Sequence, residues 1–201
     1  MAEKFDPLHA DRLEKPERLV ELPPEKVVAL LDLRGDETVV DYGAGTGMYT
    51  VPIAAALPRG RVLAVDEHEE LLSYIDAKLA AAGLPAGRVT KVQTTENRVP
   101  LEDGTADRVF LLNVLHHIWD EPAALGEILR LLAPGGRLVV VDFAQMDRPV
   151  GPPNDHVLSL DEARATVAGM GLRERSVDQP GEIGRYQIAI VAEKPLGGEA
   201  D

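Results

Sequence analysis

The chain has 201 residues, of which 45% are apolar and 27% charged, and it contains no cysteine. This length and composition favour one globular domain with a full core, whereas the missing cysteines exclude disulfides, thiolate metal sites and a cysteine nucleophile. A formal net charge of −13 disfavours nucleic acids and anionic membrane surfaces as partners, because the field of the protein repels polyanions.

The N-terminal segment is charged along its length and has no apolar signal core. No apolar run in the chain reaches the roughly 18 residues that a membrane span needs. We therefore expect a soluble, cytoplasmic protein. We expect residues 1–23 to form a lid over the binding pocket, residues 24–195 to form one domain, and residues 196–201 to be a disordered tail.

Strand and helix patterns alternate from residue 24 onward, which is typical of a parallel sheet covered by helices. Apolar residues at helical spacing, with Pro near helix starts or Gly near helix ends, predict helices within 23–33, 71–83, 122–133 and 159–171. The last of these begins with a Ser-x-x-Glu capping box formed by Ser159 and Glu162.

Short runs of β-branched and other apolar residues predict buried parallel strands at 38–42, 61–66, 88–93, 108–113 and 137–143. Two later segments, 172–178 and 185–194, alternate enough to predict two edge strands in one antiparallel hairpin, joined through 179–184. The predicted fold is α/β. It is a Rossmann-like, doubly wound, mostly parallel seven-stranded sheet with an antiparallel C-terminal hairpin and helices on both faces.

A glycine-rich turn, GAGTGM, follows the first predicted strand, at the edge where ligands bind in such sheets. The dinucleotide fingerprint Gly-x-Gly-x-x-Gly would need a glycine in place of Met48. The pattern present is Asp-x-Gly-x-Gly-x-Gly, from Asp41 to Gly47, and its carboxylate would repel a phosphate. We therefore expect a positively charged ligand without phosphate. S-adenosylmethionine, with its ammonium and sulfonium groups, is such a ligand.

At this point the sequence resembles the class I S-adenosylmethionine-dependent methyltransferases. Within them it resembles the type 11 group, through the N-terminal segments FDPLHADRL and PPEKV, the stretch TTENRVPLEDGTAD and the Gly-Pro-Pro and His of 151–156. The likeness covers roughly residues 24–143 and is carried by four motifs in the order of the family. They are the glycine-rich turn, the acid Asp66 that ends the second strand, the segment VPLEDGTADRVFLLNVLHHIWD at 99–120, and the Leu-x-Pro-Gly-Gly turn at 132–136. The resemblance implies an enzyme that takes a methyl group from S-adenosylmethionine.

The resemblance also implies which residues hold the methionine part of the cofactor. Asp41 would bind its ammonium group, directly or through water, and Asn113 would face the same amino-acid end. Close approach of the backbone to the methionine part is implied for the turn residues Gly43, Ala44, Gly45 and Gly47.

For the nucleoside part, the resemblance implies that Asp66 grips both ribose hydroxyls through charge-assisted hydrogen bonds. Glu67 would lie near the adenine. The family often places an acid after the third strand to meet the adenine amine, and here Thr95 or Glu96 would take that contact.

Methyl transfer from a sulfonium is a direct displacement, so alignment of the reactants and exclusion of water can supply much of the rate. If the acceptor must lose a proton, His116, His117 and Asp142 are the candidate catalytic groups near the strand ends. His117 and His156 are candidates for contact with the substrate. Each has a structural alternative: a histidine packed beneath the next helix, an aspartate in a cap or salt bridge, or a loop residue.

We expect no metal site, because adjacent histidines on a helix point about 100° apart and the spacing fixes no third ligand. The acceptor is expected to be a small molecule, because Asn113 is not followed by the Pro-Pro-Tyr of amine and amide methyltransferases and the acidic charge disfavours nucleic acids. Residues 145–154 are expected to line its pocket. A nicotinamide-dependent oxidoreductase, or a noncatalytic S-adenosylmethionine-binding module, remains an alternative. The acceptor atom and the oligomeric state stay open.

Overall fold

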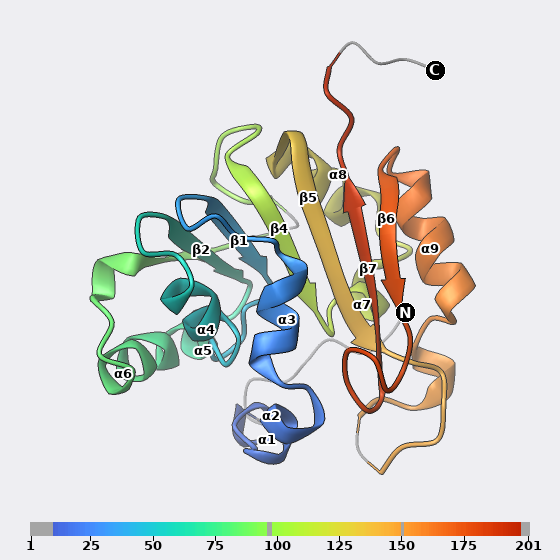
Figure 1. Cartoon of the computed structure of the whole chain (residues 1–201), viewed down its shortest axis with the longest axis horizontal. Coiled ribbons are helices and arrows are strands. Elements are labelled where there is room, and N and C mark those ends of the chain that lie inside the picture. Colours follow the sequence, from blue (N-terminus) through green and yellow to red (C-terminus); the bar gives the residue numbers. More distant parts are fainter. Residues whose placement is uncertain (1–9, 96–97, 150, 198–201) are drawn as a thin grey trace.

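The computed structural model describes residues 10–95, 98–149 and 151–197. Figure 1 shows one sheet with helices on both of its faces. The sheet has seven strands in the order β3-β2-β1-β4-β5-β7-β6. Their bounds are β1 Thr38–Tyr42, β2 Arg61–Asp66, β3 Val89–Gln93, β4 Ala106–Leu112, β5 Leu132–Phe143, β6 Arg173–Asp178 and β7 Gln187–Glu193. The predicted α/β fold is confirmed.

The pairs among β3, β2, β1, β4 and β5 are parallel, whereas β7 runs antiparallel to both β5 and β6. The sequence prediction of two edge strands is therefore wrong for β7, which lies between β5 and β6 and is buried along nearly its whole length. Only β6 of the hairpin is an edge strand, and four of its six residues are exposed. The alternation of apolar and polar residues within a segment does not show which strands will lie beside it. The pattern therefore could not distinguish a central from an edge position for β7.

Helices cover the two faces in two groups. Their bounds are α1 Ala10–Leu13, α2 Glu17–Glu21, α3 Pro24–Leu30, α4 Thr50–Ala55, α5 Glu69–Leu72, α6 Tyr74–Ala81, α7 Leu115–Ile118, α8 Pro122–Leu131 and α9 Leu160–Gly169. The apolar faces of α3 to α6 pack on one side of the sheet, and those of α7 to α9 pack on the other. Within β4, Val109 and Leu111 face the second group while Phe110 faces the first, as the two-residue period of a strand requires.

Two helix starts follow from local chemistry. Pro24 begins α3, and the predicted capping box is present at α9, where Ser159 and Glu162 bond reciprocally. The helix predicted over 71–83 is instead divided at Ser73 into α5 and α6, and α5 begins earlier, at Glu69. In the described chain no helix combines the length and apolarity needed to cross a bilayer.

The strand predicted over 137–143 begins earlier, at Leu132, so that the Pro-Gly-Gly segment lies within β5. Gly135 donates its N–H to the carbonyl oxygen of Lys194 at 2.9 Å, and Lys194 returns a bond to Gly136 O at 2.9 Å. Gly135 takes a φ of 74°, which only glycine adopts easily. The turn residues thus bend the chain while keeping it paired.

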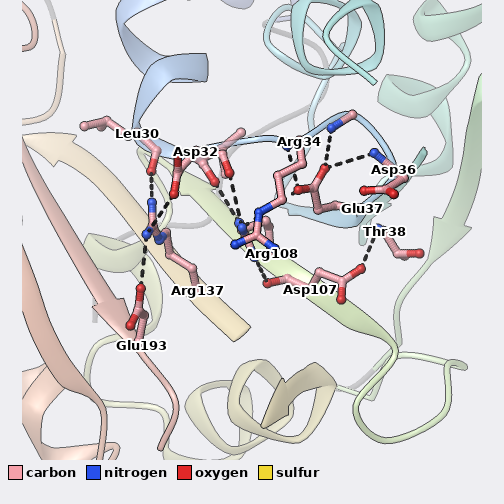
Figure 2. Close-up of polar contacts among 12 residues, drawn as sticks. Leu30, Asp32, Arg34, Asp36, Glu37, Thr38, Asp107, Arg108, Arg137 and Glu193 are labelled. Carbon is pink, nitrogen blue, oxygen red and sulfur yellow. Dashed lines mark hydrogen bonds and ion pairs between the residues drawn. The ribbon is translucent and has the colours of Figure 1, made fainter. Parts of the chain in front are cut away.

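Two arginines on the sheet secure the end of α3 at the amino end of the parallel strands (Figure 2). Arg108 of β4 donates from Nε to Leu31 O at 2.7 Å and from Nη2 to Asp32 O at 3.2 Å. Arg137 of β5 donates to Leu30 O at 3.3 Å. The last carbonyl groups of a helix have no partner within the helix, so these cations satisfy them.

The connection from α3 to β1 is closed by a buried carboxylate. Glu37 accepts hydrogen bonds from the backbone N–H groups of Arg34 at 2.7 Å and Gly35 at 2.9 Å, as Figure 2 shows. These bonds outweigh the cost of burial, and the pKa of Glu37 is lowered. This polar network fixes how the chain enters β1, at the end of the sheet remote from the turn residues 43–48.

We expect Arg108→Met to lower the free energy of unfolding by about 2 kcal/mol, because two carbonyl oxygens lose a charged donor. The matched control is Arg59→Met, which removes only an exposed pair with Asp36 at 3.8 Å and should change stability by less than about 0.5 kcal/mol. Urea titrations followed by circular dichroism measure both. Equal losses in the two variants would contradict a structural role for Arg108.

Candidate functional site

A cavity lies beside the carboxyl ends of β1, β2 and β4, on the side of the molecule toward α1, α2 and α7 in Figure 1. It is lined by the glycine-rich turn, by the residues that follow β2 and β4, and by side chains from the N-terminal helices. From β1 the chain first adds β2 and β3 on one side and then β4 and β5 on the other, so the strand order reverses beside β1. Ligands of open α/β sheets bind in the crevice at such a point.

The glycine-rich turn is hydrogen-bonded to β2 and packs closely against the side chains of Val114 and Ile75. Gly43 and Ala44 both donate their N–H groups to Val65 O, at 2.8 and 3.0 Å. A Cβ on Gly43 would lie 2.4 Å from Val114, and one on Gly47 would lie 2.5 Å from Ile75. The positive φ values at these glycines, 77° and 80°, exclude most side chains as well. Gly43, Ala44 and Gly45 line the cavity, whereas Gly47 supports the turn from outside it.

Asp41, the last residue but one of β1, lines the cavity while being only 3% exposed. Its Oδ2 accepts a hydrogen bond from Thr50 Oγ1 at 2.5 Å. Burial raises the pKa of Asp41 to about 7, and the nearby charge of Asp66 adds to the rise. A carboxylate with one protein donor in such a place is ready to bind a cation.

Asp66, at the end of β2, is fixed by two backbone donors. Its Oδ2 accepts from Gly45 N–H at 2.8 Å and its Oδ1 from His68 N–H at 2.9 Å. Burial raises its pKa, and these hydrogen bonds oppose that rise. Each carboxylate oxygen has two lone pairs, so both can still accept from hydroxyl groups of a ligand.

Asn113 follows β4 in a left-handed conformation with a φ of 55°, which is uncommon for a residue with a side chain. Its N–H donates to Val141 O at 2.8 Å, but its side-chain Oδ1 is buried in the cavity wall with no hydrogen-bond partner among the described residues. A buried acceptor without a partner is costly, so it indicates a donor supplied by a ligand.

The structure separates the two adjacent histidines. His116 is buried outside the cavity: Asp142 accepts from its backbone N–H at 3.0 Å and lies 2.7 Å from its Nδ1. His117 lines the cavity, and its Nδ1 is buried without a partner in the described chain. The two rings lie 4.0 Å apart. Burial, together with His116, lowers the pKa of His117 to about 4, so its ring is neutral at pH 7.

The other predicted residues lie at varied distances from the cavity. Glu67 lines it, but Thr95 does not; Thr95 pairs with Arg98, and the neighbouring Thr94 lines the cavity instead. Glu96 lies outside the described residues. His156 is exposed on a short 3₁₀ turn, and no described residue of 145–154 lines the cavity.

The sequence reasoning missed several lining residues. Leu13 and Arg18 come from the N-terminal helices, Ile118 is the last residue of α7, and Glu121 lies between α7 and α8. The general expectation of an N-terminal lid could not single out residues on helices of four and five residues, which are too short to show a period. For Glu121 the sequence did hold a signal. This residue directly precedes the helix predicted from Pro122, in the connection that follows the strand at 108–113, and ligands of such sheets bind at the carboxyl ends of the strands.

A family profile described as "Methyltransferase domain" matches residues 39–136. A solved S-adenosylmethionine-dependent methyltransferase from Aquifex aeolicus is 32% identical, with a TM-score of 0.85 over 94% of this chain and 99% of the other. A Syntrophotalea carbinolica protein named ubiquinone/menaquinone biosynthesis C-methyltransferase UbiE is 36% identical over 60% of this chain. The chain spans 49% of the length of that relative.

A phosphoethanolamine N-methyltransferase of Haemonchus contortus, solved with S-adenosyl-L-methionine, is 14% identical with a TM-score of 0.70 over 86% of this chain and 52% of the other. At that identity the similarity shows the fold alone.

The raised pKa of Asp41 makes the free energy of unfolding depend on pH. The folded-state pKa of about 7 lies above the value near 3.9 of an unfolded aspartate, so the folded protein binds the extra proton between these values. The stability that this group contributes is full below about pH 4 and is lost as pH rises through about 7, at about 1.4 kcal/mol per pH unit in that window.

Asp41→Asn removes this dependence. We expect the unfolding free energy of the wild type minus that of the variant to fall between about pH 4 and about pH 7 and to be level above. Urea titrations at several pH values measure the difference. The matched control is Asp155→Asn, an exposed carboxylate outside the cavity, in which Asp41 and its pH dependence remain. A level difference for Asp41→Asn across the window would contradict the raised pKa.

Proposed function

Because this chain belongs to the S-adenosylmethionine-dependent methyltransferases, we propose that it transfers a methyl group to a small, neutral, hydroxylated acceptor, with carbon as the methylated atom. The family uses S-adenosylmethionine as its cofactor. When bound, this group supplies an electrophilic methyl on a sulfonium.

The residues around the cavity fit this cofactor. The unpartnered Oδ1 of Asn113 and the carboxylate of Asp41 are suited to an ammonium group, and both line the cavity. Asp66 keeps lone pairs for the two ribose hydroxyls. We assign the amino-acid end of the cofactor to Asn113 and Asp41, and its ribose to Asp66. A pyrophosphate in place of this ligand would meet two carboxylates, which disfavours the nicotinamide alternative.

The observation that carries the acceptor proposal is the neutral His117 beside these acids. Its Nδ1 is buried, unpartnered in the described chain, and set in a wall that includes Val114 and Ile118. A ring nitrogen among apolar side chains fits one hydroxyl on a largely apolar molecule. A pKa of about 4 makes the ring a weak base, so we assign it the task of orienting that hydroxyl rather than removing its proton beforehand.

His116 and Asp142 position the His117 ring from outside the cavity. Asp142 fixes His116 through two hydrogen bonds, and the His116 ring stands 4.0 Å from that of His117. Neither lines the cavity, so we assign both a positioning role. The acidic lining makes the cavity unsuited to an anionic acceptor. Methylation at carbon is supported by the relatives named UbiE C-methyltransferases, of which the chain spans about half.

The test is methyl transfer from labelled S-adenosylmethionine to a panel of hydroquinones, simple phenols and primary amines. We expect activity with the hydroxylated rings, and carbon NMR of the product should place the new methyl on a ring carbon. Transfer to the amines alone would contradict the proposed acceptor class, and transfer to oxygen would contradict the assignment to carbon.

We expect His117→Ala to lower kcat by roughly 100-fold, because the acceptor loses its orienting contact. The affinity for S-adenosylhomocysteine, measured by calorimetry, should stay within about 2-fold, since His117 is assigned to the acceptor. His156→Ala, an exposed histidine outside the cavity, is the matched control and should change neither quantity. A parallel loss of cofactor affinity and turnover in His117→Ala would move this residue into the cofactor site.

A further inference from the structure

The chain that follows β5 folds into a compact loop around one arginine. Arg148 donates from Nη1 to the carbonyl oxygens of Ala144 at 2.7 Å and Met146 at 3.0 Å. Nη1 also donates to Asn154 Oδ1 at 2.8 Å, and Nη2 donates to Pro152 O. One guanidinium therefore binds acceptors from both halves of the loop, a task for which its five donors in a planar fork are suited.

Further contacts fix the same loop. Gln145 donates from Nε2 to Asn154 O at 3.2 Å, which joins the two ends of the loop. The guanidinium carbon of Arg148 lies 5.1 Å from the centroid of the Phe143 ring. Gly151 has a φ of 111°, and a Cβ there would lie 2.9 Å from Arg148 Nε and 3.1 Å from Phe143 Cε1. The loop therefore has one closely packed shape, which Gly151 permits because it lacks a side chain.

Arg148 holds the loop without an opposite charge. No carboxylate among the described residues forms an ion pair with it, and its Nε is buried without a partner in the same part of the chain. Burial lowers the pKa of Arg148, and the charge of Asp142 opposes that change. A partly buried cation that binds only neutral acceptors is a costly way to shape a loop. Such a cost is expected where the loop serves a ligand.

Rings connect this loop to the wall of the cavity. The Phe143 ring lies edge-on at 6.3 Å from the His116 ring, which lies 4.0 Å from the ring of His117 in the cavity wall. Burial is the main cause of the lowered pKa of His117, and the charge of His156, which follows the loop, adds to it. Because β4 and β5 are parallel, the loop lies at the same edge of the sheet as α7, as Figure 1 shows.

We name the described residues 144–149 and 151–154 the β5 loop. None of them lines the cavity, so the β5 loop is separate from the residues assigned to the cofactor. Those residues lie on β1, after β2 and after β4, whereas the β5 loop adjoins His117 from the other side of β4. An acceptor bound at His117 therefore extends toward the β5 loop.

We propose that the β5 loop, held in one shape by Arg148, forms the outer wall of the acceptor site and limits the size of the ring that the site admits. The inference rests on the proposed function, because it needs the acceptor at His117. Arg148 is a positioning residue, since it acts through the loop and does not touch the acceptor. A wall that is already fixed before binding lowers the cost of ordering the site.

The test compares methyl transfer from labelled S-adenosylmethionine to hydroquinone, with one ring, and to naphthohydroquinone, with two. A fixed wall should make the wild type prefer the smaller acceptor in kcat/KM. Arg148→Met keeps an apolar chain but removes every donor, so the loop should loosen and the preference should fall roughly 10-fold, mainly through KM. Arg148→Lys can reach fewer acceptors and should give an intermediate preference. The affinity for S-adenosylhomocysteine, measured by calorimetry, should stay within about 2-fold.

Hydrogen exchange followed by mass spectrometry measures the loop without relying on turnover. Hydroquinone added to the complex of the wild type with S-adenosylhomocysteine should slow exchange in the β5 loop, because the acceptor packs against it. In Arg148→Met the same amides should exchange faster before any acceptor is added. Exchange in the loop that hydroquinone leaves unchanged in the wild type would overturn the wall.

Arg108→Met is the matched control, because Arg108 also donates to backbone carbonyl oxygens but lies at the amino end of the strands. It should lower stability and leave the preference between the two acceptors unchanged. If Arg148→Met does not fold, Asn154→Ala removes a single acceptor of Arg148 and should lower the preference roughly 3-fold.

Two kinds of failure are distinct. An unchanged preference in a folded variant of Arg148 or Asn154, or an equal change in Arg108→Met, would overturn the wall and leave the proposed function intact. A parallel loss of affinity for S-adenosylhomocysteine in Arg148→Met would assign the loop to the cofactor and also overturn the wall. Transfer to neither acceptor by a wild type that binds S-adenosylhomocysteine would overturn the proposed acceptor class, and the wall with it.

Discussion

A carboxylate buried at the end of the central strand is the constraint on which the site depends. Asp41 lies in the sheet between β2 and β4, is 3% exposed and receives one side-chain donor, from Thr50. Burial of an acid with so little compensation costs stability, which the raised pKa reflects. Such a group is stabilised when a cation binds. We infer that the fold keeps this acid for a ligand and not for its own stability.

The surrounding structure presents that acid to the cavity. The glycine-rich turn passes over the end of β1 because Val65 O accepts two of its N–H groups, while Val114 and Ile75 occupy the space that side chains on Gly43 and Gly47 would need. The same turn sends a third N–H, from Gly45, to Asp66. The turn that follows Asp41 therefore also positions Asp66, and at the other end of the sheet the arginines near α3 fix how β1 begins.

The parallel strands were predicted because β-branched runs are local signals, and the Asp-x-Gly-x-Gly-x-Gly pattern and the end of the second strand pointed to two acids that both line the cavity. The sequence could not decide which of His116 and His117 faces the cavity, since that depends on the rotation of α7 and on Asp142, a partner 26 residues away. It assigned the contact after β3 to Thr95 or Glu96; Thr94 lines the cavity, Thr95 does not, and Glu96 lies outside the described residues, so that contact stays a prediction. Arg18 was missed because a short helix has no readable period and its position depends on tertiary contacts.

The most direct test of the central claim is a calorimetric comparison of S-adenosylhomocysteine with the analogue that lacks only its α-amino group, made at pH 8 on the wild type and on Asp41→Asn. If the buried acid binds the ammonium, loss of the amine should weaken binding to the wild type by roughly 30-fold and leave the variant nearly unaffected. An equal loss in both proteins, or binding of NADH in place of S-adenosylhomocysteine, would contradict the account.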